Sequence, residues 1–538
     1  MNSPASQDPA VVDADRTAGA PREAGLARSA GTLGLGNVAS RVIGLAREAV
    51  ISWYFGSSGE LSAFSLAARV PAMIYDLLVG GMLSAALVPV FSDYARAEKR
   101  DELARVASAM LSLIAIAMGM IAILLELFAV PVASILGDFE DPALQLVLAN
   151  CLRLMAPAIL MFGISGCVAG LLYAFKRFNY AAVGGAVFNL GIVIAAPLLA
   201  GSIGIYALPL GVVVGSILQL GLMFPGLRDI RLRLSAAWGH PAVRRILRLY
   251  LPILLGLIVT QAQIIVDGRW ASATGAQSVS WMRYATTLIQ MPLGLVPVAV
   301  SLAALPSLSQ RAADGNWDAF RAIFARGLRL ITVLLIPATV GLWVLAVPVI
   351  ALLFQHGNFT PYDTEMTAQA LRLYLLGLPF AGVDFLLNYT FYARQNTRTP
   401  AIVGVISVGL YFIVAASLKG PFGYLGLVFA DSVKQAGHAL IMVVLLLRSV
   451  GRPHDGIRKT LIAAIGAAVT MGAAVWLVSR GLAAVLPEGL LGELLVVAVS
   501  AGVGIILYLA VLRLSGTPEA ITLINALQGR LRRTRSAP

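Results

Sequence analysis

The chain has 538 residues, of which 59% are hydrophobic and only 12% are charged, and its mean hydropathy is +0.84. So few polar side chains cannot cover a soluble globule, and the composition therefore indicates an integral membrane protein. The net charge of +13 does not indicate a nucleic-acid-binding protein, because most of the basic residues lie in short loops between apolar segments.

Residues 1–28 are rich in Ala, Pro, Asp and Ser and have no apolar secretory signal, which predicts a disordered cytoplasmic tail. About fourteen apolar segments follow, each long enough to cross a hydrocarbon layer about 30 Å thick as a helix. We expect these spans at residues 29–55, 62–94, 104–136, 144–174, 179–200, 205–226, 246–270, 278–308, 324–353, 366–393, 400–418, 423–448, 458–480 and 490–514.

The loops after the even-numbered spans are basic, and the loop after the third span is acidic. The basic residues include Arg96, Lys99, Arg100, Lys176, Arg177, Arg228, Arg231, Arg233, Arg394, Arg398, Arg452 and Lys459. Positive loops remain on the cytoplasmic side, so this pattern places both termini there, including a basic tail at residues 516–538.

Two parts of the sequence repeat each other. Phe64 to Pro89 aligns with Trp281 to Pro306, and Gly204 aligns with Gly423. The repeat predicts an all-α fold with two six-helix lobes, at residues 29–228 and 240–450, and two further helices at residues 456–515. Because each lobe has an even number of spans, the lobes share one orientation, which is typical of transporters that work by alternating access around a central site.

Several charged side chains fall inside the spans, where a charge costs about 3 kcal/mol or more, so such residues usually face a cavity. The candidates are Arg41, Arg47, Glu48, Arg69 and Asp76 in the first lobe and Asp267, Arg269 and Arg283 in the second. Guanidinium groups bind phosphate oxygens in a bidentate manner, so their excess predicts an anionic cargo with a phosphate or pyrophosphate group. The alternative for Arg47, Glu48, Asp267 and Arg269 is a local ion pair or a side chain that reaches the membrane surface.

Asp384 and Asn388 lie four residues apart on one helix face, and Asp267 belongs to another span. Their oxygen atoms suit a monovalent cation such as Na⁺. The alternative is an interhelical hydrogen-bond pair, with His438 as a further residue for proton coupling or packing. We find no ATP-binding motif and no nucleophile with a base, so we expect a transporter without a cofactor, not an enzyme.

The segment SRVIGLAREAVISWYFG, from Ser40 to Gly56, resembles the first-helix signature of the MurJ (MviN) lipid II flippases, which belong to the multidrug/oligosaccharidyl-lipid/polysaccharide exporter superfamily. Further motifs occur in the family's order: ALVPVFSDY (86–94), SWMRYA (280–285), LPSLSQ (305–310), LFQHGNFT (353–360) and FYARQNTRTP (391–400). The resemblance covers about residues 29–515.

The resemblance implies a flippase in the bacterial inner membrane. It would move lipid II, an undecaprenyl-pyrophosphate-linked disaccharide-pentapeptide, to the outer leaflet for peptidoglycan synthesis. The family's cavity positions fall on Ser40, Arg41, Arg47 and Glu48, and on Arg69 and Arg269. Glu48 stands where an Asp is usual in the family, and three further sites differ: Ser62 replaces a common Asp, Tyr75-Asp76 replaces an Arg pair seen in some members, and Thr287 replaces the eighth-helix Arg. Arg283 lies one helical turn before Thr287, and we expect it to replace the missing cation.

Two alternatives follow from these departures. In the first alternative, the chain is a flippase whose cargo is another polyprenyl-linked glycan. In the second, the chain is a membrane scaffold that recruits cell-wall synthesis enzymes and no longer transports. Membrane lipids are expected partners in every case, and nucleic acid is not.

Overall fold

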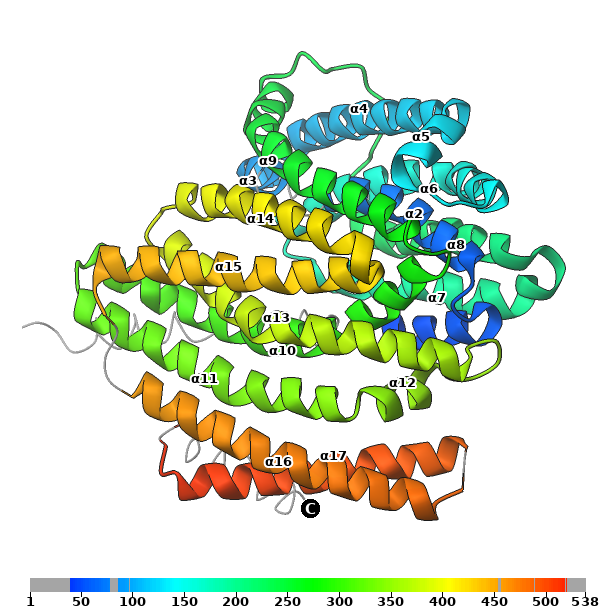
Figure 1. Cartoon of the computed structure of the whole chain (residues 1–538). Coiled ribbons are helices and arrows are strands. Elements are labelled where there is room, and N and C mark those ends of the chain that lie inside the picture. The colour runs from blue at the N-terminus through cyan, green and yellow to red at the C-terminus, as the bar shows by residue number, and fades with distance from the viewer. Residues whose placement is uncertain are drawn as a thin grey trace, which may run out of the picture. The chain divides into compact units, whose positions relative to one another are not determined.

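The computed structural model describes residues 39–77, 86–95, 97–452, 456–487, 489–517 and 519, without the side chains of residues 181 and 252–260. All regular secondary structure in these ranges is helical, as Figure 1 shows, which confirms the all-α prediction. The expected tail at residues 1–28, and most of the one at residues 516–538, lie outside the described residues.

The first described helix covers residues 39–55. The α-helices that follow are α2 (Gly59–Tyr75), α3 (Val88–Tyr94), α4 (Arg100–Leu127), α5 (Ala129–Leu136), α6 (Pro142–Ala174), α7 (Phe178–Ile203), α8 (Ala207–Met223), α9 (Pro241–Ser272), α10 (Ser278–Ala313), α11 (Trp317–Val344), α12 (Ala346–Phe354), α13 (Pro361–Ala393), α14 (Arg398–Phe422), α15 (Tyr424–Val450), α16 (Ile457–Val485) and α17 (Leu490–Leu514). Three short 3₁₀ helices join them: η2 (Ala97–Lys99), η3 (Gly204–Tyr206) and η4 (Phe224–Leu227).

Ten helical segments of the described chain are long and apolar enough to cross a membrane, and one of them, Phe178–Leu227, contains both α7 and α8. The three expected spans without such a segment, at residues 29–55, 62–94 and 246–270, all include residues or side chains outside the description. The count of fourteen spans therefore stays a prediction.

Two expected spans, at residues 104–136 and 324–353, each consist of two helices instead of one. Proline explains both breaks, because its ring clashes with the carbonyl group four residues earlier and it has no N–H to bond that carbonyl. Pro131 of α5 follows Leu127, the last residue of α4, by four residues. Pro348 of α12 follows Val344, the last residue of α11, by the same distance.

The predicted repeat is visible in the backbone angles. Gly204 ends α7 with φ 59° and ψ −137°, and Gly423 ends α14 with φ 58° and ψ −137°. Lys176 and Gln395, which follow matching Tyr-Ala pairs, are the two described non-glycine residues with positive φ, at 59° and 56°. Such angles strain a residue with a Cβ atom, so their recurrence at matching positions supports two copies of one helical unit.

The chain divides into two compact units. The first comprises residues 1–50, 67–133 and 149–258, and the second comprises residues 51–66, 134–148 and 259–538. The unit boundaries thus fall inside the first described helix, α2, α5, α6 and α9. Residues 51–66, which belong to the first half of the sequence, are part of the second unit.

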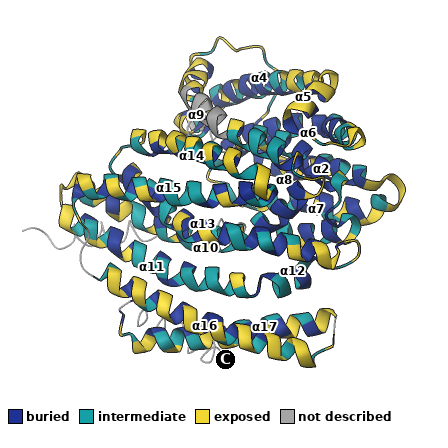
Figure 2. Cartoon of the chain, in the orientation of Figure 1, coloured by how far each residue is buried: buried dark blue, intermediate teal, exposed yellow. Residues whose placement is uncertain are grey.

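Helices α11, α16 and α17 of the second unit share an apolar core that includes Val333, Met471 and Val475. The Tyr508 hydroxyl in this core donates a hydrogen bond of 2.7 Å to the Val333 carbonyl oxygen. The opposite faces of α16 and α17 carry exposed apolar side chains such as Leu477 and Ile506 (Figure 2). Exposed apolar helix faces of this kind are suited to contact with lipid.

Candidate functional site

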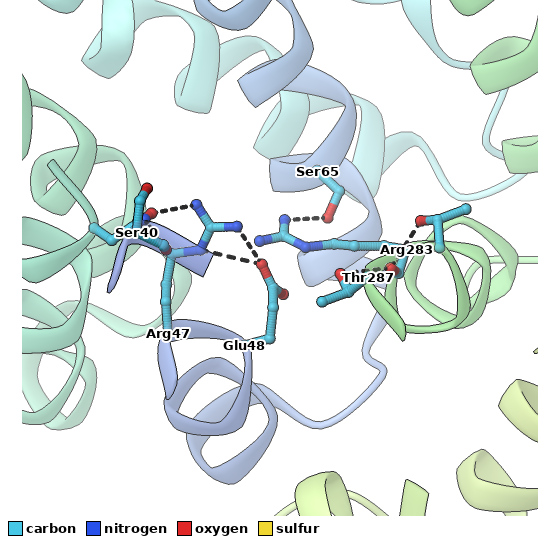
Figure 3. A network of polar contacts seen from close by, with 8 residues as sticks. Ser40, Arg47, Glu48, Ser65, Arg283 and Thr287 are labelled. Carbon is cyan, nitrogen blue, oxygen red and sulfur yellow. Dashed lines mark hydrogen bonds and ion pairs between the residues drawn. The ribbon is translucent and has the colours of Figure 1, made fainter. Parts of the chain in front are cut away.

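Arg47 lies at the centre of a polar cluster in the first unit (Figure 3). Its Nε and Nη2 atoms donate to Glu48 Oε1 at 3.1 and 2.6 Å, and its Nη1 donates to Asn189 Oδ1 of α7 at 2.8 Å. Glu48 is 1% exposed and Arg47 is 25% exposed, so the carboxylate is enclosed while part of the guanidinium is accessible. These contacts use three of the five guanidinium N–H groups and fix the plane of the group.

The other predicted residues of the first unit surround this cluster or lie on α2. Asn189 also donates to the Ser40 carbonyl oxygen at 3.4 Å, which ties the start of the first described helix to α7. Gly185 allows this approach, because a Cβ atom there would lie 2.9 Å from Ser40 Oγ. Arg41 and Arg69 are half-buried, whereas Asp76 is exposed just beyond the end of α2.

Arg283 is the centre of a second polar cluster, which lies in the second unit (Figure 3). Its Nη1 donates to Ser65 Oγ at 2.9 Å, and its guanidinium carbon lies 5.6 Å from the centroid of the Phe64 ring. Both partners belong to the segment 51–66. The hydroxyl of Thr287 donates to the Arg283 carbonyl oxygen, one helical turn earlier, at 3.0 Å.

Two serines, each three residues before Ser65 or Arg283, also connect the segment 51–66 to α10. Ser62 Oγ and Ser280 Oγ are 2.9 Å apart, and both side chains are fully buried. This pair joins α2 to α10 through neutral hydroxyl groups.

Arg269 has different surroundings from the other predicted cations. Its Nη1 donates to the Ser134 carbonyl oxygen at 2.6 Å, and its Nη2 lies 3.3 Å from Asp138 Oδ2. Both side chains of this ion pair are about half exposed. This is the local pairing that the sequence offered as the alternative to a role in the cavity.

Asp384, Asn388 and His438 come together between α13 and α15. Asn388 Nδ2 donates to Asp384 Oδ2 at 2.9 Å, and His438 Nδ1 lies 2.5 Å from Asp384 Oδ1, with both partners mostly buried. Asp267 of α9 accepts a hydrogen bond from the hydroxyl of Tyr411 on α14 instead. Within the described part of the chain, no three His, Cys, Asp or Glu side chains are grouped so that they hold a metal ion.

The motif LFQHGNFT forms a tight connection between the loop after α12 and residues 53–56. Asn358 donates from its backbone N to the Trp53 carbonyl oxygen at 3.0 Å and from its side chain to the Tyr54 carbonyl oxygen at 2.6 Å. Gly357 has φ 62°, and a Cβ atom there would lie 2.2 Å from the Trp53 oxygen. Tyr284 completes the connection by donating to the Gly56 carbonyl oxygen at 2.8 Å. We call residues 53–56 with residues 356–358 the latch.

Sequence reasoning identified the charged residues but not their partners. Asn189, Ser65 and Tyr411 are uncharged and lie 142, 218 and 144 residues from Arg47, Arg283 and Asp267. The sequence contained a signal only for the latch: the Gly-Asn pair in the motif LFQHGNFT indicates a backbone turn.

Comparisons with known proteins agree with this architecture. A family model described as lipid II flippase MurJ matches residues 51–497. The chain is 31% identical over 504 residues to a probable lipid II flippase MurJ of Vibrio cholerae, a match that covers 89% of this chain and 94% of the relative. It is 29% identical over 448 residues to the lipid II flippase MurJ of Burkholderia cenocepacia, covering 80% and 86% of the two chains.

Solved structures show the same fold. A lipid II flippase MurJ in an inward closed conformation matches with a TM-score of 0.75 and 24% identity, over 89% of this chain and 97% of that one. An inward-facing multidrug resistance MATE transporter of the MOP superfamily matches with a TM-score of 0.65 and 14% identity, over 78% and 96% of the two chains. With a family model that extends over most of the chain and a relative above 30% identity, the chain belongs to the MurJ family of lipid II flippases.

Proposed function

We propose that this chain is a flippase that carries lipid II from the inner to the outer leaflet of the bacterial cytoplasmic membrane, with both termini cytoplasmic and without covalent chemistry. The observation that carries the proposal is the match of the flippase family model to residues 51–497. The positive loops of the sequence support the orientation, and the paucity of charge supports the membrane location.

The pyrophosphate of the cargo requires cationic groups, and the chain supplies them in both units. Arg47 and Arg283 are each held by neutral or acidic neighbours that fix the guanidinium orientation before a ligand arrives. A fixed planar group loses little freedom when it binds phosphate oxygens, so preorganisation favours binding. Arg41 and Arg69 are the further cations that we assign to this role, whereas Arg269 is paired with Asp138.

Transport by alternating access requires that some contacts break once in each cycle. The candidates in this chain join residues 51–66 to the rest of the second unit: the latch, the Ser62–Ser280 pair and the Arg283–Ser65 bond. They consist of hydrogen bonds that are worth about 0.5–1.5 kcal/mol each, or about 1.5–3 kcal/mol for the bond to the charged Arg283, so the set can be broken and formed again. Arg283 would thus bind either Ser65 or the cargo.

The energy source is a separate part of the proposal. We assign a Na⁺ site to Asp267, Asp384 and Asn388, because carboxylate and amide oxygens are ligands for such ions. The oxygens of Asp384 already face His438 and Asn388, and Asp267 accepts from Tyr411. Na⁺ must therefore displace a hydrogen-bond donor at each carboxylate. The alternative energy source is a proton gradient, with the proton bound by the Asp384–His438 pair.

The test is a flipping assay in proteoliposomes with fluorescent lipid II. Arg283→Ala should lower the rate about 10- to 100-fold, which corresponds to about 1.5–3 kcal/mol for hydrogen bonds to a charged group. Arg283→Lys should restore part of the activity, because it keeps the charge without the planar fork. The control is Arg458→Gln, an exposed cation at the start of α16.

Parent protein that inserts correctly but does not move lipid II would contradict the proposal. Movement of a different polyprenyl-linked glycan would then identify the cargo, and no movement of either lipid would favour the scaffold. Full activity of Arg283→Ala would remove Arg283 from the site while leaving the cargo in place.

A further inference from the structure

The connection between η4 and α9 lies against α4 in the first unit and has no role in the proposed transport site. It covers residues 228–240, with the sequence RDIRLRLSAAWGH, and has no helix or strand along its length. We call these residues the linker strap. In Figure 1 it is the green loop that leads into α9 and passes beside α4.

Two hydrogen bonds hold the strap in register with α4. The backbone N of Arg233 donates to Ser108 Oγ at 3.0 Å, and the backbone N of Ser235 donates to Ser112 Oγ at 2.9 Å. Two residues of extended chain span about 6.6–6.8 Å, and four residues of helix rise about 6 Å. The strap therefore follows the axis of α4 for one helical turn.

The middle of the strap reaches the point on α4 where its exposed apolar face begins. No side chain of α4 is exposed from residue 106 to residue 115, a stretch that contains both serines. The next turn carries Ile116, which is 53% exposed, followed by Met120 at 56% and Ile123 at 63%. Because exposed apolar residues on a membrane-spanning helix are suited to contact with lipid, we expect the tip of the strap to lie at the edge of the hydrocarbon layer.

The chain then returns to the start of α4. His240 Nε2 lies 3.7 Å from Glu102 Oε1, and the His240 ring meets the edge of Tyr94. The strap is thus held at both ends, by the Asp229–Arg177 ion pair near its start and by the contacts of His240 at its end.

The outward side chains of the strap are apolar or cationic. Leu234 is 90% exposed and Trp238 is 42% exposed, and Arg228, Arg231 and Arg233 are also exposed. The strap's one acidic residue, Asp229, pairs with Arg177, and this guanidinium holds the pKa of the carboxyl below its usual range, so its charge is retained and compensated. Three further guanidinium groups then have no acidic partner within the strap.

We propose that the linker strap is a binding surface for anionic phospholipids. Leu234 and Trp238 enter the boundary between head groups and acyl chains, where Trp is favoured. Arg231 and Arg233, together with Arg228, bind lipid phosphates, which attract basic segments at the membrane surface. The inference is independent of the cargo, because none of these residues belongs to the proposed transport site.

The experiment reconstitutes the full chain into nanodiscs containing brominated phosphatidylglycerol or brominated phosphatidylcholine at equal mole fractions. Bromine quenches nearby tryptophan emission, and the difference between the parent and Trp238→Phe isolates Trp238 from the other tryptophans. We expect both lipids to quench Trp238, with phosphatidylglycerol at least about threefold more effective at low mole fraction, given the attraction of each basic residue to an anionic surface.

A matched pair of variants distinguishes binding of anionic lipid by the strap from an effect of the protein's net charge. Arg231→Gln with Arg233→Gln should abolish the preference for phosphatidylglycerol while quenching by phosphatidylcholine persists. Arg458→Gln with Lys459→Gln removes the same charge at the exposed start of α16 and should leave the preference intact. Trp238 emission that neither lipid quenches would overturn the proposal, as would a preference that survives in the strap variant.

Discussion

At the scale of single residues, the proposed cargo-binding cations differ from surface cations in how they are held. Glu48 is almost fully buried and has its charge next to Arg47, so each of the two side chains depends on the other. Because Arg47 and Glu48 are adjacent in the sequence, their pairing could be foreseen. The contact with the Asn189 amide of α7, which orients the guanidinium, could not. A contact between residues 142 positions apart has no signature in local spacing.

Glu48→Ala should lower the free energy of unfolding by about 3–5 kcal/mol, because it leaves a partly buried guanidinium without its counter-charge. Glu48→Gln keeps a hydrogen-bond acceptor and should lower it by less. Unfolding of purified protein in a denaturant series measures both values. Equal stability of Glu48→Ala and the parent would show that the pair does not hold this part of the structure together.

Gly357→Ala should destabilise the latch. The added Cβ atom would meet the Trp53 carbonyl oxygen, and the positive φ angle would strain any other residue, at a combined cost of about 1–3 kcal/mol. Gly404→Ala within α14 is the control, because no atom lies within 4 Å of its Cβ position and alanine favours a helix by about 1 kcal/mol. Thermal unfolding should therefore move in opposite directions for the two variants, and a shift in the same direction would contradict this description of the latch.

At the scale of elements, the sequence predicted most of the helices closely, because long apolar segments between charged loops define their own limits. The expected spans at residues 144–174 and 490–514 correspond to α6 (Pro142–Ala174) and α17 (Leu490–Leu514). The breaks before Pro131 and Pro348 were missed, since prolines are common within membrane helices and Pro292 and Pro297 leave α10 continuous. Which proline ends a helix depends on tertiary packing that spacing does not reveal.

The latch gives a prediction at the same scale. The rings of Trp53 and His356 are 6.0 Å apart and nearly parallel, and the backbones of residues 53 and 357 are in contact, so the variant Trp53→Cys with His356→Cys brings two thiols near each other. Oxidation should join the last turn of the first described helix to the loop after α12 and stop flipping, and reduction should restore it. The native Cys151 and Cys167 are buried, which limits their interference.

The single variants Trp53→Cys and His356→Cys, treated with the same oxidant, are the controls. Transport at the parent rate by fully cross-linked protein would show that the latch stays closed throughout the cycle.

At the scale of the whole molecule, the division into two units and the internal repeat are the basis of the proposed cycle. Residues 51–66 belong to the first half by sequence and to the second unit by packing. The repeat could be read from the sequence because Gly204 and Gly423 mark the same turn in each half. The unit boundaries could not, because they depend on hydrogen bonds between distant residues such as Ser62 and Ser280.

Ion coupling gives a prediction at this scale. Replacing Na⁺ by choline should slow flipping by the parent, and Asp384→Asn should flip slowly in both media, because a neutral side chain holds a cation weakly. His438→Gln should raise the apparent affinity for Na⁺ by removing the group that faces Asp384 Oδ1. Flipping rates as a function of Na⁺ concentration measure all three. Rates of the parent that do not depend on Na⁺ would remove Na⁺ as the coupling ion.

Complementation of bacteria depleted of their own lipid II flippase asks whether this chain moves lipid II in a cell. The parent chain and its Arg41→Ala variant are compared at matched levels in the membrane. The parent should restore growth and cell shape and Arg41→Ala should not, because the cationic site binds the pyrophosphate of the cargo. Failure of the correctly inserted parent to restore growth, or equal rescue by both proteins, would contradict this prediction.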